Sequence, residues 1–184
     1  MAFLPHVVNG AQAAANPTLR SQLDTATQLR RRVFIDEQKV PEDLEWDGQD
    51  LIATTTHAWL TDGSGQVVAI GRVLQDVPDN PCVVHIGRVA VDSSLRGTGV
   101  GRQIMALLEH VGADVASTAA PQASAVRCVL AAQVQAVGFY LALGYELIDG
   151  TTYMDAGIPP PGHAQGGAVL NRHRASDRVT THSN

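Results

Sequence analysis

The chain has 184 residues, of which 45% are hydrophobic and 17% are charged, and its formal net charge is −5. That length is sufficient for one hydrophobic core, and the acidic balance argues against nucleic acid as the main partner. Without a run of eighteen apolar residues or an N-terminal export signal, the chain is expected to have no membrane partner and to be cytoplasmic. Cys82 and Cys128 lie in or beside apolar, strand-like runs, which favours buried free thiols over a disulfide or a metal site.

The first predicted elements are a helix and a loop. Apolar residues recur at helical spacing between positions 19 and 33, Thr18 is a candidate cap, and the helix is expected to end near Glu37. Segment 40–56 shows neither the helical nor the strand spacing of apolar residues and contains five acidic residues, so it is predicted to be a loop beside the substrate. Such a loop would favour a cationic acceptor such as an amine, although most acidic loops are only solvated surface.

Strand-like runs and helical stripes alternate along the rest of the chain. Runs at 57–60 and 66–74 flank Asp62-Gly-Ser-Gly65, which is typical of a hairpin. A long strand is expected at 82–91, followed by an amphipathic helix whose stripe covers 100–115. A short strand at 126–131 and a helix at 133–143 come next, and runs at 145–148 and 152–155 predict a second hairpin around Asp149-Gly150.

These elements predict a single α+β domain over residues 1–160. Beyond it the composition changes to prolines, glycines and polar residues, without an apolar face that could be buried. Residues 161–184 are therefore predicted to form a mobile tail.

The glycine-rich turn after the long strand is the clearest binding motif. Glycines at 97, 99 and 101 lead into a helix, so backbone N–H groups and the positive end of the helix dipole can converge on an anion. A Walker loop would need Lys and then Ser or Thr after Gly101, where the chain has Arg102 and Gln103. A dinucleotide fingerprint would need Gly-x-Gly-x-x-Gly, which the spacing excludes. Another phosphate compound is therefore expected.

Three segments together carry a more specific signal. They are Arg96-Gly-Thr-Gly99-Val-Gly101, Gln133-Val-Gln-Ala136-Val-Gly-Phe139-Tyr140-Leu-Ala-Leu-Gly144-Tyr145, and Arg31-Arg-Val-Phe-Ile-Asp-Glu37-Gln38. The first two resemble the pyrophosphate loop and the Asn-x-x-Ala-x-x-x-Tyr-x-x-x-Gly-Phe segment of the GCN5-related N-acetyltransferase (GNAT) superfamily, with Gln133 for Asn and Tyr145 for Phe. The third, with Ile86-Gly-Arg-Val89, resembles the ElaA-like branch of that superfamily.

The resemblance implies the GNAT acyl-CoA N-acyltransferase fold, a mixed, mostly antiparallel sheet with splayed central strands flanked by helices. Acetyl-CoA, the implied cosubstrate, would lie in the cleft between strands 82–91 and 126–131, and no metal is implied. Pantetheine would pair with the backbone of Val89, Ala90 and Val91 and contact Gln133. The pyrophosphate would be held by the remaining implied residues, Arg96, Gly97, Thr98, Gly99, Val100, Gly101 and Arg102.

The implied chemistry is direct attack of an amine on the thioester in a ternary complex. Tyr140 stands where the family places a tyrosine that protonates the leaving thiolate, and the alternative is an aromatic residue that only fills the core. His85 and Glu37 are rival general bases, with a satisfied strand histidine and a solvated helix-surface acid as their plain alternatives. Alternation along the strand places His85 on the face of Val89 and Val91, and Arg88 on the opposite face.

Two functions follow from the resemblance. The first is an acetyl-CoA-dependent N-acetyltransferase that transfers acetyl to a primary amine of a small molecule or peptide. The second is a catalytically weak acyl-CoA-binding or sensing module of the same fold. An intact Tyr140 and a complete glycine loop favour the enzyme. The resemblance also allows a homodimer, and the sequence leaves the acceptor amine open.

Overall fold

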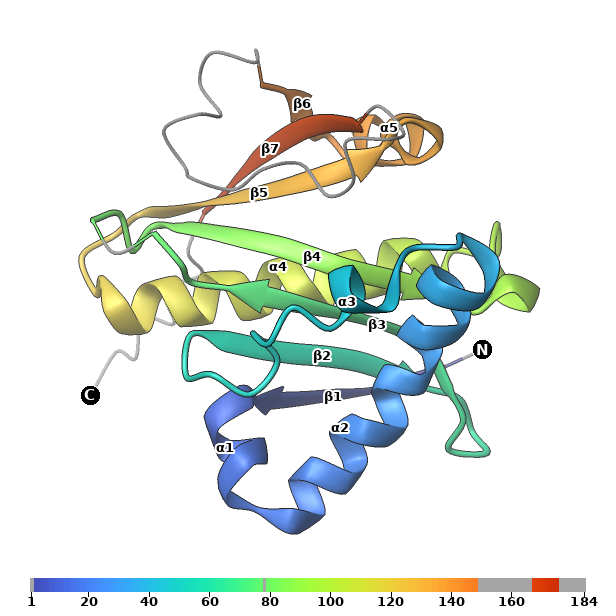
Figure 1. Ribbon diagram of the computed structural model, residues 1–184. Helices are drawn as coiled ribbons and strands as arrows, with labels where there is room; N and C mark the ends of the chain where they lie inside the picture. The colour runs from blue at the N-terminus through green and yellow to red at the C-terminus, as the bar shows by residue number, and fades with distance from the viewer. Residues whose placement is uncertain (1, 78, 149–166, 176–184) are drawn as a thin grey trace.

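Figure 1 shows the computed structural model of the protein, which describes residues 2–77, 79–148 and 167–175. In that part the strands form one sheet in the order β1-β2-β3-β4-β5-β7-β6, in which only β4 and β5 pair in parallel. The strands are β1 (Leu4–Asn9), β2 (Thr55–Thr61), β3 (Val67–Leu74), β4 (Val83–Val91), β5 (Ala125–Gln133), β6 (Glu146–Leu147) and β7 (Gly167–Ala175). The helices are α1 (Gly10–Ala15), α2 (Pro17–Arg30), the π-helix η1 (Arg31–Glu37), α3 (Glu42–Glu45), the 3-10 turn η2 (Ser93–Leu95), α4 (Val100–Ala119) and α5 (Val134–Leu141).

The helices cover the two faces of this sheet, which confirms the predicted α+β architecture. In Figure 1, α4 lies behind the sheet and α1, α2 and α3 lie in front of it. The stripe of α4 is fully buried at Ile104 and Leu108, whereas Leu23 of α2 packs in a second core with Trp59 and Ile70. Within the described residues, no helix combines the length and the hydropathy needed to span a membrane.

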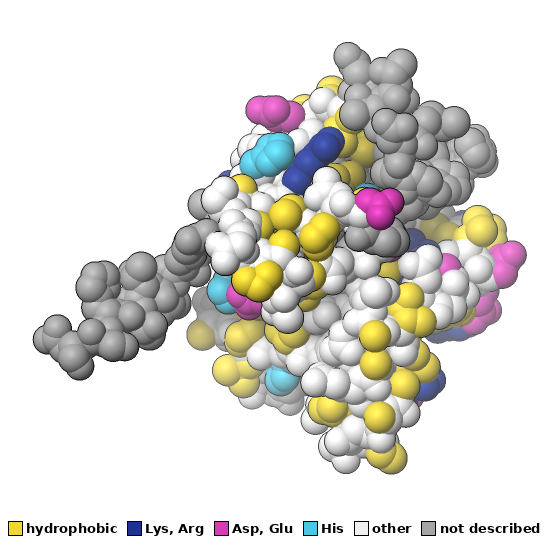
Figure 2. All heavy atoms as spheres, turned by 90° about the vertical axis from the view of Figure 1, so that its left-hand side faces the viewer, with side chains coloured by type: hydrophobic (Ala, Val, Ile, Leu, Met, Phe, Trp, Pro, Cys, Tyr) yellow, Lys and Arg dark blue, Asp and Glu magenta, His cyan; other side chains and the backbone are white. Residues whose placement is uncertain are grey.

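The end of the molecule that lies at the left of Figure 1 faces the viewer in Figure 2. Small groups of hydrophobic side chains are scattered there among uncharged atoms, and the described residues form no patch of one charge on this face.

The cap of the first long helix lies two residues earlier than predicted. Asn16, rather than Thr18, caps α2, because its Oδ1 accepts hydrogen bonds from the backbone N–H groups of Thr18 at 2.9 Å and Leu19 at 3.2 Å. Pro17 occupies the first helical position, where its missing N–H costs nothing. The helix continues as η1 to Glu37, as expected.

Strand β7 corrects the predicted tail. Residues 167–175, inside the expected tail 161–184, pair antiparallel with β5 and with β6. The composition misled because only Leu170 is a fully buried apolar side chain, while Arg172 and Arg174 find their partner in Glu109 of α4. The turn and strand predicted at 149–150 and 152–155, and the rest of the predicted tail, lie outside the described residues.

Strands β4 and β5 diverge, which confirms the predicted splay. They share three pairs, from Val83↔Arg127 to His85↔Val129, although both strands continue further. We call residues 86–91 of β4 and 130–133 of β5, which do not pair with each other, the splayed segment. Backbone groups of this segment face a gap in the ladder, so another extended chain can pair with them.

A bulge in β4 changes which way its side chains face. The register with β3 shifts so that two residues, Arg88 and Val89, oppose Gly71, and Arg88 takes a φ of 53°. Ile86 packs in the α4-side core before the bulge, and Val89 packs against the same core after it. Arg88 therefore shares the α2 side of the sheet with His85. The predicted opposition of these two residues is wrong, because strict alternation cannot reveal an inserted residue.

Candidate active site

The glycine loop lies at the end of the splayed segment, where α4 begins (Figure 1). Gly97 and Gly99 have φ values of 79° and 94°, and no atom lies within 4 Å of the position that a Cβ would take at either residue. Helix α4 begins at Val100 without a side-chain cap, so the orphan donors of its first turn face the loop. Backbone N–H groups and the positive end of the helix dipole therefore converge on this loop, which is the arrangement expected of an anion site.

The side chains of the loop have distinct surroundings. The Thr98 hydroxyl donates to the carbonyl of Leu95 at 2.7 Å, and Val100 is buried, so either residue can reach a ligand here through its backbone. At Gly101 a Cβ would lie 3.2 Å from Cζ of Phe139, so this glycine allows α5 to approach α4. Arg102 is exposed on the first turn of α4.

Two predicted cofactor residues are joined to the end of η1. Arg96 donates from Nη2 to Oε2 of Glu37 at 2.6 Å and from Nε to the carbonyl of Val91 at 3.2 Å. Gln133 donates from Nε2 to Oε1 of Gln38 at 2.9 Å. The structure thus brings Glu37, a predicted rival base, into an ion pair with the loop.

Tyr140 lies in α5 and packs in the α4-side core. Its ring makes edge-to-face contacts with Phe139 at 5.1 Å and with Tyr145 at 5.8 Å between ring centroids. Burial raises the pKa of Tyr140 to about 12. The phenol therefore keeps its proton at neutral pH and remains a hydrogen-bond donor.

His85 lies where β4 and β5 part. Its Nδ1 is hydrogen-bonded to a carboxylate oxygen of Asp76, and its Nε2 is buried without a hydrogen-bond partner. Sequence analysis missed Asp76. The antiparallel pair Leu74↔His85 provides a signal, because a residue just beyond the end of β3 lies next to the partner strand.

A network of buried and partly exposed charges lies under α3. It joins three arginines of α2, β3 and β4 to three carboxylates of the acidic loop: Arg30, Arg72 and Arg88 with Glu45, Asp47 and Asp50. Three of the five acids that would favour a cationic acceptor thus already bind arginine. The loop pattern alone could not reveal this, because the arginines lie on other elements.

Arg88 is held within this network. Its Nε lies 2.8 Å from Oε2 of Glu45, and its Nη2 donates to the carbonyl of Leu44 at 2.6 Å. Burial lowers the pKa of Arg88, and the neighbouring Arg72 adds to that effect. This side chain therefore pairs with carboxylates beside the sheet.

The Asp47→Asn variant is expected to be about 1 kcal/mol less stable than the wild type at pH 7, because solvent around the partly exposed Asp47 screens its ion pair. Burial by itself would raise the pKa of Asp47, but the hydrogen bond and charge of Arg72 outweigh burial and lower the pKa to about 2. A carboxyl group whose pKa is lower in the folded state stabilises the fold above its unfolded pKa, and this contribution disappears as pH falls. Urea unfolding should therefore show the stability difference shrinking between about pH 4 and pH 2.

The matched control for this prediction is Asp114→Asn, because the side chain of Asp114 is 68% exposed on α4. It should leave stability nearly unchanged at both pH values. A difference for Asp47→Asn that is the same at pH 7 and pH 2 would show that the ionised carboxylate is not the stabilising group.

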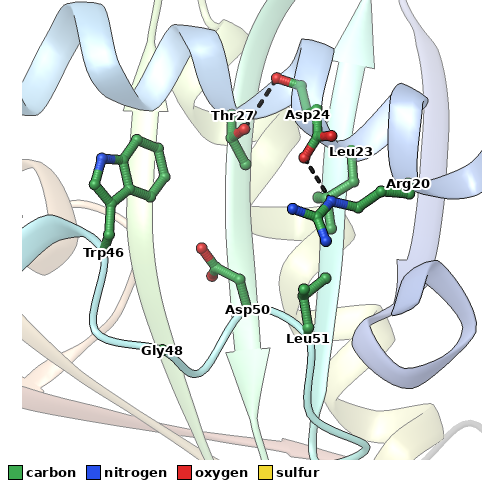
Figure 3. A pocket seen from close by; sticks show the side chains of 8 residues that line it. All are labelled: Arg20, Leu23, Asp24, Thr27, Trp46, Gly48, Asp50 and Leu51. Carbon is green, nitrogen blue, oxygen red and sulfur yellow. Dashed lines mark hydrogen bonds and ion pairs between the residues drawn. The ribbon is translucent and has the colours of Figure 1, made fainter.

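A pocket of about 240 Å³ lies between α2 and residues 46–51 (Figure 3). It is lined by Arg20, Leu23, Asp24, Thr27, Trp46, Gly48, Asp50 and Leu51. The carboxylate of Asp50 points into it, but this carboxylate already binds Arg30 at 2.9 Å and Arg72 at 2.8 Å. The pocket therefore presents little free charge, and none of the predicted site residues lines it.

A second hollow, of about 200 Å³, lies beside the first turns of α4. Its lining residues are Arg102, Met105, Ala106, Glu109, Leu143, Arg172 and Arg174. Glu109 neutralises part of the charge by pairing with Arg172 at 3.1 Å and Arg174 at 3.0 Å. Arg102 thus lies near two other arginine side chains beside the first turns of α4.

The two cysteines are free, with Cys128 buried and Cys82 only partly so. Burial raises the pKa of Cys128 to about 12, so this thiol is unreactive near neutral pH. Among residues 2–77, 79–148 and 167–175, no three His, Cys, Asp or Glu side chains are grouped to hold a metal ion.

Comparisons with known proteins agree with this geometry. The sequence profile of the family described as "Acetyltransferase (GNAT) domain" matches residues 22–160. The uncharacterized N-acetyltransferase YjcF of Bacillus subtilis is 35% identical over 138 residues, covering 75% of this chain and 88% of that protein. Protein ElaA of Escherichia coli is 34% identical over 148 residues, covering 79% and 88%.

Solved structures give the same result. An acyl-CoA N-acyltransferase from Pseudomonas aeruginosa superposes with a TM-score of 0.67 and 26% identity, covering 93% of this chain and 99% of that chain. The crystal structure of Escherichia coli ElaA gives a TM-score of 0.64 and 25% identity with the same coverage.

Proposed function

The chain belongs to the GNAT acetyltransferase family, in its ElaA-like branch, and from this membership we propose that it is an acetyl-CoA-dependent N-acetyltransferase acting on a primary amine of a small molecule or peptide. One observation carries the proposal. The parallel ladder of β4 and β5 ends after three pairs, and the uncapped, glycine-lined start of α4 lies at the end of the gap. An extended thioester with an anionic end fits both features.

In this proposal acetyl-CoA lies along the splayed segment. The backbone of Val89, Ala90 and Val91 pairs with the pantetheine amides, and the loop 97–101 holds the pyrophosphate. Arg96 and Arg102 add positive charge, and the amide of Gln133 contacts the pantetheine arm. The carbonyl of Val91 also accepts a hydrogen bond from Arg96, which links the two parts of the site.

The proposed transfer forms a C–N and an S–H bond and breaks a C–S and an N–H bond. The amine nitrogen attacks the thioester carbon, the C–S bond breaks, and the acetyl group ends on nitrogen as an amide. The ammonium proton passes to a base, directly or through water, and Tyr140 donates a proton to the leaving thiolate. We propose His85 as the base, because Asp76 engages Nδ1 and leaves Nε2 as the acceptor atom, whereas Glu37 is already paired with Arg96.

The His85→Gln variant is expected to lower kcat/KM about 100-fold while acetyl-CoA still binds. Asp76→Asn should weaken activity in the same direction by releasing the ring. His110→Gln, on the exposed surface of α4, is the matched control. A wild-type kcat/KM in His85→Gln would exclude His85 as the base.

Release of the free thiol of CoA across a panel of primary amines tests the function itself. An N-acetyltransferase releases thiol in proportion to the amide formed, and only when an acceptor is present. Acetyl-CoA binding without acceptor-dependent thiol release would reject the enzyme and support the alternative, an acyl-CoA-binding or sensing module.

A further inference from the structure

Two neighbouring residues at the end of η1 contact opposite sides of the splayed segment. Glu37 accepts a hydrogen bond from Arg96, which follows β4, and the next residue, Gln38, accepts one from Gln133 at the end of β5. The two strands do not pair with each other at this level. A single dipeptide therefore links the two sides of the gap that we assign to acetyl-CoA.

The backbone around this dipeptide is well fixed. The N–H of Gln38 donates to the carbonyl of Val33 at 3.1 Å, and this hydrogen bond closes the wide turn of the π-helix. Val33 itself is buried. Lys39, two residues beyond the end of η1, has a φ of 59°. Arg32, at the start of η1, lies 3.7 Å from Asp92 at the end of β4. Single π-helical turns are frequent at functional sites, and this one is anchored at both ends.

The contacts also orient the groups that they hold. Arg96 uses Nε for Val91 and Nη2 for Glu37, and within the described residues Nη1 has no acceptor. One edge of the guanidinium is thus fixed and the other can meet a phosphate oxygen. The Gln133 amide is fixed similarly, because Nε2 donates to Gln38 and Oε1 accepts from Gln135. Its second N–H can then donate to a carbonyl of pantetheine.

We propose that Glu37 and Gln38 are positioning residues for the cofactor, Glu37 acting through Arg96 on the pyrophosphate and Gln38 acting through Gln133 on the pantetheine arm. This inference rests on the proposed function. It gives Glu37 a role other than general base. It also explains why these two side chains point to opposite sides of the gap although they are adjacent in the chain.

The test measures binding of two probes by calorimetry, acetyl-CoA and S-acetylpantetheine, which lacks the pyrophosphate. Glu37→Gln should weaken acetyl-CoA binding about 10-fold and leave S-acetylpantetheine binding unchanged, because only the pyrophosphate needs Arg96. Gln38→Ala should weaken both probes by a similar factor of about 3 to 10, because both contain the pantetheine arm. The double variant Gln38→Ala/Gln133→Ala should bind the probes hardly more weakly than Gln38→Ala alone, since both substitutions remove the same contact.

Glu42→Gln is the matched control for Glu37→Gln. Glu42 pairs with Arg31 at 2.6 Å, the same distance as Glu37 and Arg96, and the side chains of both pairs are about half exposed. This variant should bind both probes like the wild type, because its ion pair does not touch the loop or β5.

Kinetics separate positioning from catalysis. At saturating acetyl-CoA, Glu37→Gln should retain kcat within about twofold and raise only the KM for acetyl-CoA. A large fall in kcat with unchanged binding would make Glu37 the base and overturn the inference. Equal weakening of acetyl-CoA and S-acetylpantetheine binding in both Glu37→Gln and Gln38→Ala would also overturn it. A wild type that binds acetyl-CoA without transferring acetyl would reject the proposed enzyme but leave the binding test valid. A wild type that binds neither probe would reject both.

Discussion

Replacement of Gly99 by glutamate is expected to weaken acetyl-CoA binding at least about 100-fold while the protein stays folded. Gly99 precedes α4 with a φ of 94°, and open space surrounds its Cβ position, so the new side chain enters the space proposed for the pyrophosphate. Its carboxylate would repel that group. The strain of a side chain at this φ costs about 1–2 kcal/mol, and a negative charge at the start of a helix offsets part of it. Calorimetry with acetyl-CoA measures the loss.

Gly65→Glu is the matched control for this experiment. Gly65 has a φ of 84° and equally open surroundings, but it lies in the turn between β2 and β3. The substitution adds the same strain and charge away from the loop, so binding should not change. Gly99→Ala adds the strain without the charge and should lose less affinity than Gly99→Glu. Unchanged affinity in Gly99→Glu would refute the assignment of the loop.

Elements with strong local patterns could be predicted from the sequence. The strand-like apolar runs of β3 and β4, the stripe of α4 and the glycines at 97 and 99 are properties of short segments, and each forms the expected structure. Such periods reflect the geometry of a strand or a helix, so they need no knowledge of distant residues. The order of three motifs then predicted the fold with splayed central strands, which the broken ladder of β4 and β5 confirms.

Features that depend on partners far along the chain could not be predicted in this way. Glu37 meets Arg96 across 59 positions, and Gln38 meets Gln133 across 95 positions. Nothing in the local pattern of either residue specifies its partner. The bulge at Arg88 and the strand β7 were missed for a related reason, because arginines paired with carboxylates on other elements have the composition of a polar surface.

Replacement of Tyr140 by phenylalanine is expected to lower kcat about 100-fold, with the KM for acetyl-CoA within about twofold of the wild type. Phenylalanine keeps the ring and its packing against Phe139 and Tyr145, and only the hydroxyl is lost. Because burial raises the pKa of Tyr140 to about 12, the phenol is protonated throughout the range near neutral pH. The loss in kcat should therefore be the same at every pH from about 6 to 9.

The control for this prediction is Tyr145→Phe, which introduces the residue usual at that position in the motif. Tyr145 is 2% exposed and its ring contacts that of Tyr140, so the variant removes a phenol from the same core. A general effect of losing a buried hydroxyl would lower the activity of both variants and show equal changes in unfolding free energy. A proton donor at the thiolate would be lost only in Tyr140→Phe. If Tyr140→Phe retains wild-type kcat, the tyrosine only fills the core and the thiolate receives its proton from another group.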